Sequence, residues 1–432
     1  MEIRNFTDIK SLLFDNKTVK QTIFKNTFWL AGAEGMGKMM KLILLIYVAR
    51  ILGATDYGKF SFALAFIGLF SVLATLGLSR IVVREFSQNR EKEKDFSAIF
   101  SLRIIFSLIV LVLIIIGSFF ITPDDLIRKL IWILAVYTLL EGLTSFLNFF
   151  FQARQKMEYE AGSKIFRMAL LTILGLIIVF FFPSVENLSY AYLFSAVFTF
   201  IVITIIFHFK FYRLGLNLDK MVWKRYLKMS WPLIISGIFI TIYGQIDSVM
   251  MGYFNQITET GWYNAALRIA GAAFIPIGLI STSFYPALSK TIGESKNEFR
   301  KNWANFMKIM IILSVLAIIG GILLAPMIIN LIYGSDYNSS IFAFQILIVM
   351  VGISFLHNPF NQALIISNQQ KKFFWASLVG VIVNIVLNLI LIPKYSLYGA
   401  AAASAITSFI VLLFLLGITW RFTSIFNNEF KK

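Results

Sequence analysis

Charged side chains lie inside long apolar runs of this 432-residue chain, where they could contact an anionic ligand or a coupling ion. Glu34, Lys38 and Lys41 are spaced four and three residues apart, and this spacing places them on one face of a helix. A Glu34–Lys38 pair one turn apart could neutralise itself. Lys41 adds a further charge, and each charge at membrane depth costs about 3 kcal/mol on insertion scales. We therefore favour a helix face that lines a water-filled cavity.

A second group of polar side chains lies in the C-terminal half of the chain. Tyr243 and Asp247 are one turn apart in one apolar run, and Asn264 and Arg268 are one turn apart in the next. Arg268 could pair with Asp247, or it could contact an anionic substrate. The guanidinium group suits a phosphate because it can donate two parallel hydrogen bonds. We favour the substrate contact for Arg268, although Asp247 could also lie near the outer interface of the membrane.

A polar stripe of Glu141, Ser145, Asn148 and Gln152 follows one face of another predicted helix. Such a stripe either lines a cavity or forms hydrogen bonds with a neighbouring helix, and the sequence leaves both readings open. The residues expected to bind substrate are Lys38, Lys41, Tyr243, Asn264, Arg268, Ser145 and Asn148. The residues expected to couple transport to Na⁺ or H⁺ are Glu34, Glu141 and Asp247.

Other residue types argue against several kinds of chemistry. With no cysteine and only two histidines, the chain predicts neither a thiolate site nor a histidine metal centre, and we expect no cofactor. His357 and Asn361, one turn apart, are more typical of packing between helices than of a site. Residues 32–38 fit the start of a phosphate-binding loop, but Met39 stands where Ser or Thr would hold Mg²⁺. We therefore expect no bound nucleotide.

The composition indicates a membrane protein. Hydrophobic residues make up 58% of the chain, and charged residues make up 14%, against about 25% in soluble domains. A soluble fold cannot bury that much apolar surface, which excludes a soluble enzyme and a nucleic-acid-binding domain. About 250 apolar residues would fill about twelve spans of about 20 residues each.

Twelve apolar runs are each long enough to cross a bilayer as a helix. They lie at roughly 26–51, 59–79, 97–121, 128–151, 161–182, 188–208, 230–252, 262–287, 304–331, 341–366, 373–392 and 396–420. With residue 1 in the cytoplasm, 28 of the 39 Lys and Arg residues lie in cytoplasmic segments, 4 in outside loops and 7 in or beside helices. This asymmetry predicts a multi-pass protein of the plasma (inner) membrane with both termini in the cytoplasm. It also explains the pI of about 9.8 without a nucleic-acid partner.

An internal repeat divides the predicted helices into two halves. Residues 25–96 align without gaps onto residues 228–299, with an offset of 203. The repeat unit has six helices, so both halves have the same orientation in the membrane, and an axis along the membrane normal should relate them. The predicted organisation is an arm at 1–25, an N-lobe at 26–209, a basic linker at 210–229, a C-lobe at 230–420 and a tail at 421–432.

The motifs Asp56–Ala63 and Thr260–Arg268, together with Asp247, resemble those of Wzx-type polysaccharide flippases. These proteins form the polysaccharide transporter family of the multidrug/oligosaccharidyl-lipid/polysaccharide exporter superfamily. The resemblance covers roughly residues 20–420. It implies an all-α integral membrane protein with twelve transmembrane helices in two pseudo-two-fold-related six-helix bundles around a central cavity.

The resemblance also implies a function. The chain is expected to be a transporter and not an enzyme. It would move a polyprenyl-(pyro)phosphate-linked oligosaccharide from the cytoplasmic to the outer leaflet by alternating access. The expected partners are the lipid-linked oligosaccharide, membrane lipid and other membrane proteins of a polysaccharide pathway. Coupling to a Na⁺ or H⁺ gradient is expected in such proteins.

Two other functions stay open. A cation-coupled multidrug antiporter of the same superfamily also has twelve helices, but it uses acidic groups to hold cations, whereas here Lys38, Lys41 and Arg268 add positive charge. A membrane-embedded glycosyltransferase or polymerase would usually need a carboxylate-bearing loop. The predicted outside loops have roughly ten residues or fewer.

Overall fold

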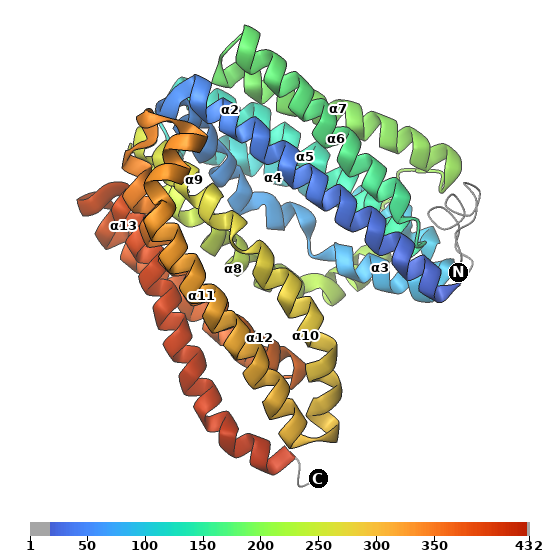
Figure 1. The fold of residues 1–432 in the computed structure, drawn as a ribbon. Helices are drawn as coiled ribbons and strands as arrows, with labels where there is room; N and C mark the ends of the chain where they lie inside the picture. Colours follow the sequence, from blue (N-terminus) through green and yellow to red (C-terminus); the bar gives the residue numbers. More distant parts are fainter. Residues whose placement is uncertain (1–17, 430–432) are drawn as a thin grey trace, which may run out of the picture. The chain divides into compact units, whose positions relative to one another are not determined.

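The computed structural model describes residues 18–429, and in this part of the chain every regular element is a helix (Figure 1). The first elements are α2 (Val19–Thr75), α3 (Leu78–Gln88), η1 (Arg90–Asp95), α4 (Phe96–Ile121), α5 (Asp125–Ala153), α6 (Met157–Phe181) and α7 (Val185–Lys210). They are followed by α8 (Lys220–Tyr253), α9 (Ile257–Ala272), α10 (Ile275–Glu294), α11 (Lys296–Tyr333), η2 (Ser335–Tyr337), α12 (Ser339–Ile366) and α13 (Gln370–Glu429). Most of the predicted arm and the last three residues of the predicted tail lie outside the described residues.

Two of the longest helices are interrupted by a single residue with non-helical backbone angles. In α2 this residue is Gly53, at φ 78° and ψ 172°, a conformation that glycine adopts at little cost because it has no Cβ. In α13 it is Ser396, at φ 53° and ψ −130°. A further break follows α2, where Leu76 and Gly77 both have positive φ. Gly53 falls in the predicted loop between spans 26–51 and 59–79, and Ser396 is the first residue of the predicted span 396–420. The third break falls inside the predicted span 59–79.

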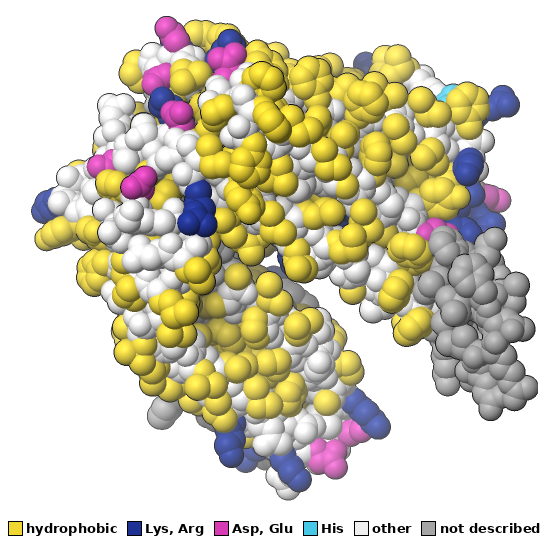
Figure 2. Space-filling view, turned by 45° about the horizontal axis from the view of Figure 1, so that its top comes forward, with side chains coloured by type: hydrophobic (Ala, Val, Ile, Leu, Met, Phe, Trp, Pro, Cys, Tyr) yellow, Lys and Arg dark blue, Asp and Glu magenta, His cyan; other side chains and the backbone are white. Residues whose placement is uncertain are grey.

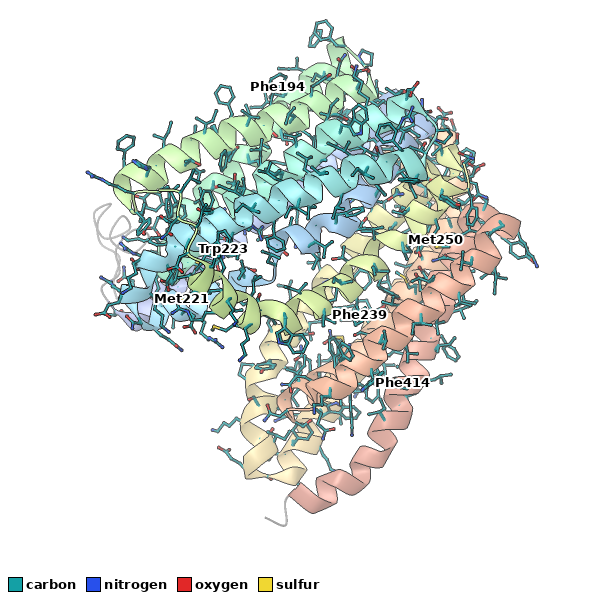
Figure 3. All side chains as sticks on the ribbon, turned by 180° about the vertical axis from the view of Figure 1, so that it is seen from behind. Phe194, Met221, Trp223, Phe239, Met250 and Phe414 are labelled. Atoms are coloured by element: carbon teal, nitrogen blue, oxygen red, sulfur yellow. The ribbon has the colours of Figure 1, made fainter. Side chains whose placement is uncertain are left out.

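The helices have the length and composition of membrane spans. Among the described residues, nine helical stretches are long and apolar enough to cross a membrane, or ten if the two parts of the bent α8 are counted as one span. Figure 2 shows a face on which hydrophobic side chains cover most of the surface and most charged side chains lie near its edges. Phe194 on α7, labelled in Figure 3, is 56% exposed. Such exposed aromatic side chains are expected where lipid replaces water. The prediction of an all-α multi-pass membrane protein is confirmed, whereas the number of twelve spans stays a prediction.

The described chain divides into two compact units. The N-terminal unit contains residues up to Leu52 and residues 66–238, and the C-terminal unit contains residues 53–65 and everything from Phe239 onward. The segment 53–65, the middle part of α2, therefore packs with helices from the other half of the sequence. Between α7 and α8 the residues 212–219 have no regular structure.

Aromatic rings form the core of the N-terminal unit. Phe96 of α4 lies at the centre, with its ring centroid 5.2 Å from that of Phe146, 5.1 Å from that of Phe150 and 5.1 Å from that of Phe207. All four side chains are fully buried. These contacts hold α4, α5 and α7 together, and α5 is the helix that carries the predicted polar stripe.

Small residues allow the helices of the C-terminal unit to approach closely. A Cβ atom on Gly352 of α12 would lie 2.4 Å from the side chain of Ile318 of α11, and the Ser314 hydroxyl donates to the Gly352 carbonyl at 2.8 Å. Gly321 approaches Ile348 in the same way. Close approach through small residues and hydroxyl-to-carbonyl bonds is the usual packing of helices in lipid.

The segment 53–65 crosses α9 through two glycines. A Cβ atom on Gly58 would lie 1.9 Å from the carbonyl oxygen of Ile257, and one on Gly261 would lie 2.0 Å from the carbonyl oxygen of Ala54. The two contacts are reciprocal, because Ala54 and Gly58 correspond to Ile257 and Gly261 at the repeat offset of 203. The crossing thus brings equivalent positions of the predicted repeat face to face.

Candidate functional site

A small, strongly charged pocket lies between α2 and α6 in the N-terminal unit. Its volume is about 130 Å³, and it is lined by Ala33, Glu34, Gly37, Lys38, Lys41, Lys164, Arg167 and Met168. Four of these side chains are cationic and one is anionic. The face of α2 predicted from the spacing of Glu34, Lys38 and Lys41 therefore faces a second row of charges on α6.

An ion pair between Lys164 and Glu34 connects α6 to α2 at this pocket. The ammonium group of Lys164 lies 2.7 Å from the carboxylate of Glu34 and 3.0 Å from that of Glu160, one turn earlier on α6. The direct ion pair of Glu34 is therefore with Lys164 of α6, and not with Lys38 one turn along α2. Glu34 is half exposed, with 51% of its side chain accessible, so the pair borders open space.

Arg167 extends the charged row toward α5. Its guanidinium group forms an ion pair with Glu141 and donates a hydrogen bond to the Tyr137 hydroxyl at 3.2 Å. The Arg167 side chain is 13% exposed, and that of Glu141 is 32% exposed. The pair is therefore largely removed from solvent, where charge interactions are stronger than at a surface.

The rest of the predicted stripe on α5 has less contact with this pocket. Asn148 is buried, and its side-chain oxygen has no hydrogen-bond partner among the described residues. Ser145 is half-buried. Arg103, on α4, is fully buried and donates to the Gly142 carbonyl at 3.2 Å, next to Glu141 in sequence. The structure brings Glu141 to the charged pocket through Arg167, while Ser145 and Asn148 are not among the residues that line it.

The contribution of α6 to this pocket was not predicted from the sequence. Glu160, Lys164 and Arg167 are spaced four and three residues apart, the same signal that singled out α2. Lys164 falls close to the start of the predicted span 161–182, and a cation at the end of a span is common and does not by itself indicate a site. The helical spacing of the three charged residues was therefore the signal that could have identified them.

A buried carboxylate network lies in the C-terminal unit. Asp247 on α8 is 7% exposed and accepts hydrogen bonds from the Tyr263 hydroxyl at 2.5 Å and the Ser404 hydroxyl at 2.5 Å. The Asn388 amide donates to the same carboxylate at 2.6 Å and to the Asn384 side-chain oxygen at 3.1 Å. Helices α9 and α13 thus supply the donors to one ionisable group on α8.

The network contains unsatisfied oxygens and nitrogens as well. The side-chain oxygen of Asn388 and the side-chain nitrogen of Asn384 are buried and have no partner among the described residues. A carboxylate with neighbouring amide and hydroxyl oxygens can hold a proton or a hard cation. These surroundings suit the coupling role predicted for Asp247, and its side chain is buried inside the unit.

The other predicted residues of this unit have separate surroundings. Asn264 is buried, and its amide donates to the Ser248 hydroxyl at 3.0 Å and to the Thr260 carbonyl at 2.9 Å, so it links α9 to α8. Arg268 is half-buried and forms no ion pair with Asp247. Of the two alternatives for Arg268, the structural pair is therefore wrong.

Within the described residues, no cluster of three or more His, Asp or Glu side chains could hold a metal ion. The charged pocket and the Asp247 network could instead bind anions and exchange small cations or protons.

Both the sequence and the fold resemble those of known proteins. Residues 23–292 match the family model described as "Polysaccharide biosynthesis protein". The chain is 24% identical to the capsular polysaccharide biosynthesis protein CapF of Staphylococcus aureus, covering 90% of this chain and 97% of that protein. It is 22% identical to a protein of Escherichia coli strain K12 described as an O-antigen transporter, covering 92% and 97%. The fold resembles the inward closed structure of the lipid II flippase MurJ with a TM-score of 0.75 and 18% identity, covering 90% of this chain and 87% of that one.

Proposed function

Since the chain belongs to the polysaccharide biosynthesis protein family, we propose that it is a flippase for a polyprenyl-pyrophosphate-linked oligosaccharide. It moves the sugar head group from the cytoplasmic to the outer leaflet of the plasma membrane, in the service of cell-surface polysaccharide synthesis. A relative described as an O-antigen transporter and the MurJ-like fold support a transporter. The head group enters a wet chamber while the polyprenyl tail stays in lipid. This route avoids moving a hydrated sugar through hydrocarbon, where unsatisfied polar groups cost several kcal/mol each.

The observation that carries the proposal is the charged pocket between α2 and α6. In the proposed topology, Gly53 marks the outer end of the first span. Lys41 lies twelve residues before Gly53, which is roughly 18 Å along the helix axis. This distance puts the pocket well inside a hydrocarbon core of about 30 Å. Even with Glu141 and Glu160 counted as counter-charges, the cations Lys38, Lys41, Lys164 and Arg167 outnumber the carboxylates around it. A net positive site at membrane depth suits a pyrophosphate, and Arg268 in the C-terminal unit is proposed to contact the same class of group.

The proposed topology has twelve spans in two six-helix lobes. The breaks at Gly53 and Ser396 divide α2 and α13 into two spans each, and α8 counts as one. The lobes are those of the sequence analysis, at 26–209 and 230–420, with a cytoplasmic linker at 210–229. The cationic residues of the linker and loops then face the cytoplasm, as the positive-inside rule requires, and both termini lie there.

The Asp247 network is the proposed coupling site. Its carboxylate, on α8, lies among hydroxyl and amide groups from α9 and α13, so binding or release of Na⁺ or H⁺ would change how these three helices pack. In this proposal, the incoming pyrophosphate replaces Glu34 as the partner of Lys164 and replaces Glu141 as the partner of Arg167. Membrane lipid and other membrane proteins of the polysaccharide pathway are the remaining proposed partners.

A reconstituted flipping assay tests the proposal. The purified protein is placed in vesicles with a short-chain polyprenyl-pyrophosphate sugar, and access of the sugar to an added periodate reagent reports its leaflet. We expect Lys41→Ala and Arg268→Ala to abolish the protein-dependent movement without loss of expression. Lys301→Ala is a matched control, because Lys301 is an exposed lysine at the start of α11. Full activity in both test variants would remove the head-group assignment.

Two further measurements separate the alternatives. Ethidium efflux from cells that express the protein would favour a multidrug antiporter, and the absence of efflux would weaken that reading. Transfer of a radioactive sugar to an acceptor by the purified protein would favour a glycosyltransferase or polymerase. We expect neither activity, because the charged pocket repels cationic drugs and holds no group arranged for glycosyl transfer.

A further inference from the structure

A second pocket lies in the C-terminal unit and differs from the charged one in its chemistry. It has a volume of about 280 Å³, and helices α8, α12 and α13 and the turn before α10 form its walls. Its lining residues are Phe239, Ile240, Tyr243, Phe274, Met350, Ser354, His357, Asn361, Phe373, Ala376, Ser377, Gly380, Val381 and Val411. No Lys, Arg, Asp or Glu is among these residues.

The walls of this pocket are mainly aromatic and aliphatic. Phe239 lies on α8 (Figure 3), and its ring packs edge-on against Phe374 with the centroids 5.4 Å apart. Phe274 and Phe373 add two further rings to the lining. The walls therefore offer flat, apolar surfaces to a ligand, as binding pockets for small molecules usually do.

Polar groups enter the pocket at a few positions. Ser354 and Ser377 donate their hydroxyl hydrogens to carbonyls of their own helices, at 2.9 Å and 3.0 Å, which leaves their oxygens as acceptors. His357 Nε2 lies 2.8 Å from the Ser408 carbonyl. Because a carbonyl can only accept, Nε2 carries a hydrogen, and Nδ1 is an acceptor when the ring is neutral.

The remaining polar side chains of the lining are those of Tyr243 and Asn361. Tyr243 and Asn361 form no hydrogen bond with any described residue, although both line the pocket. In a dry pocket an unsatisfied hydroxyl or amide would cost free energy. A ligand that fills this pocket should therefore supply both donors and acceptors to these two side chains.

These features together exclude most classes of ligand. A cationic drug would need a carboxylate, and a phosphate would need Lys or Arg, and the lining has neither. A hydrocarbon chain would leave Tyr243 and Asn361 unsatisfied. An uncharged sugar ring has apolar faces of C–H bonds and a rim of hydroxyl groups, so it matches both the aromatic walls and the scattered polar groups.

We infer that the C-terminal unit carries a binding pocket for an uncharged pyranose ring, with Tyr243 and Asn361 as its hydrogen-bonding residues and the phenylalanines as its walls. This inference rests on the proposed function and deepens it, because it assigns a place to a neutral sugar of the transported head group. It also gives a role to His357 and Asn361, which the sequence alone places among packing residues.

Saturation-transfer NMR on the purified protein in nanodiscs tests the inference, since the method detects weak sugar binding. The probes are methyl β-glucoside as the neutral sugar and glucuronate and glucosamine as its charged counterparts. We expect the neutral sugar to receive the strongest signal. We expect Tyr243→Phe and Asn361→Leu each to raise its Kd by about three- to tenfold, because each removes one hydrogen bond.

Matched controls make the test specific. Tyr395→Phe and Asn330→Leu are the same substitutions at exposed positions outside the pocket, and they should leave binding unchanged. Tyr243→Phe removes a single hydroxyl oxygen and keeps the ring, so it should fold, and a thermal unfolding curve checks that it does. Binding by both test variants with wild-type Kd, or equal binding of charged and neutral sugars, would overturn the inference.

The outcome is separable from a failure of the proposed function. Lys41→Ala should lose flipping and keep the sugar signal, because Lys41 belongs to the other unit. If the wild-type protein flips no lipid-linked sugar, the proposed function fails. If it flips the substrate while the Tyr243→Phe and Asn361→Leu variants bind sugar normally, the pocket assignment alone fails.

Discussion

Arg167 and Glu141 form a largely buried ion pair that joins α6 to α5 at the charged pocket. Removing one partner of such a pair leaves an uncompensated charge and costs about 3–5 kcal/mol. We expect Arg167→Met to lower the melting temperature of the purified protein and to reduce flipping. The double variant Arg167→Met/Glu141→Gln removes both charges, so it should recover most of the stability but not the flipping. If the double variant transports at the wild-type rate, Arg167 serves packing only.

The second prediction at the residue scale concerns the role of the Asp247 carboxylate in ion coupling. Its carboxylate accepts three short hydrogen bonds, and an asparagine at this position would present an amide group to at least one of the same donors. We expect Asp247→Asn to slow flipping and to abolish its dependence on an imposed Na⁺ or pH gradient. The measurement is the flipping rate in vesicles with and without each gradient. Ser248→Ala, next to it in sequence, is the control that should keep the gradient dependence.

The sequence could place Glu34, Lys38 and Lys41 on one face because helical spacing is a local property. It could not identify Lys164 as the partner of Glu34, because the choice depends on which helix packs beside α2. The same limit applies to Asp247, whose donors lie 16, 141 and 157 residues away along the chain. Helix spacing therefore predicts which residues share a face, and helix packing decides which of them meet.

At the scale of single elements, the close crossing of α9 with the segment 53–65 depends on glycine. A Cβ atom on Gly261 would lie 2.0 Å from the Ala54 carbonyl oxygen, so the helices would have to move apart. We expect Gly261→Ala to cost about 1–3 kcal/mol of stability, as overpacking does. Gly271→Ala on the same helix is the control, since a Cβ atom there has no neighbour within 4 Å. Equal melting temperatures for the two variants would contradict the crossing.

Most helices were predictable from apolar runs, because a span must satisfy its own backbone hydrogen bonds. The predicted span 97–121 and helix α4, at Phe96–Ile121, differ by one residue. The break after α2 was not predictable, because it falls at Leu76, which has positive φ without being a glycine. Residues 220–229, predicted as part of the linker, form the first turns of α8. Charged helix ends and charged linkers look alike in a sequence, and only the structure separates them.

At the scale of the whole molecule, Thr55 and Thr258 occupy equivalent positions of the predicted repeat and lie in contact. Their hydroxyl oxygens are 2.8 Å apart, and they differ by the repeat offset of 203. A pseudo-two-fold axis brings equivalent residues together only near the axis itself. In the proposed orientation, both residues fall at helix ends on the outer side of the membrane.

Alternating access predicts that the contact between Thr55 and Thr258 opens during transport. To release a sugar outward, the segment 53–65 must part from α9, since a contact held at the outer face in every state would keep that side closed. The chain has no cysteine of its own, so Thr55→Cys/Thr258→Cys introduces a single possible disulfide at a short separation. We expect oxidation to stop flipping in vesicles and a reductant to restore it, while each single cysteine variant flips under both conditions. Undiminished flipping by the fully cross-linked protein would mean that the crossing stays closed throughout the cycle, and that the outward path opens somewhere else.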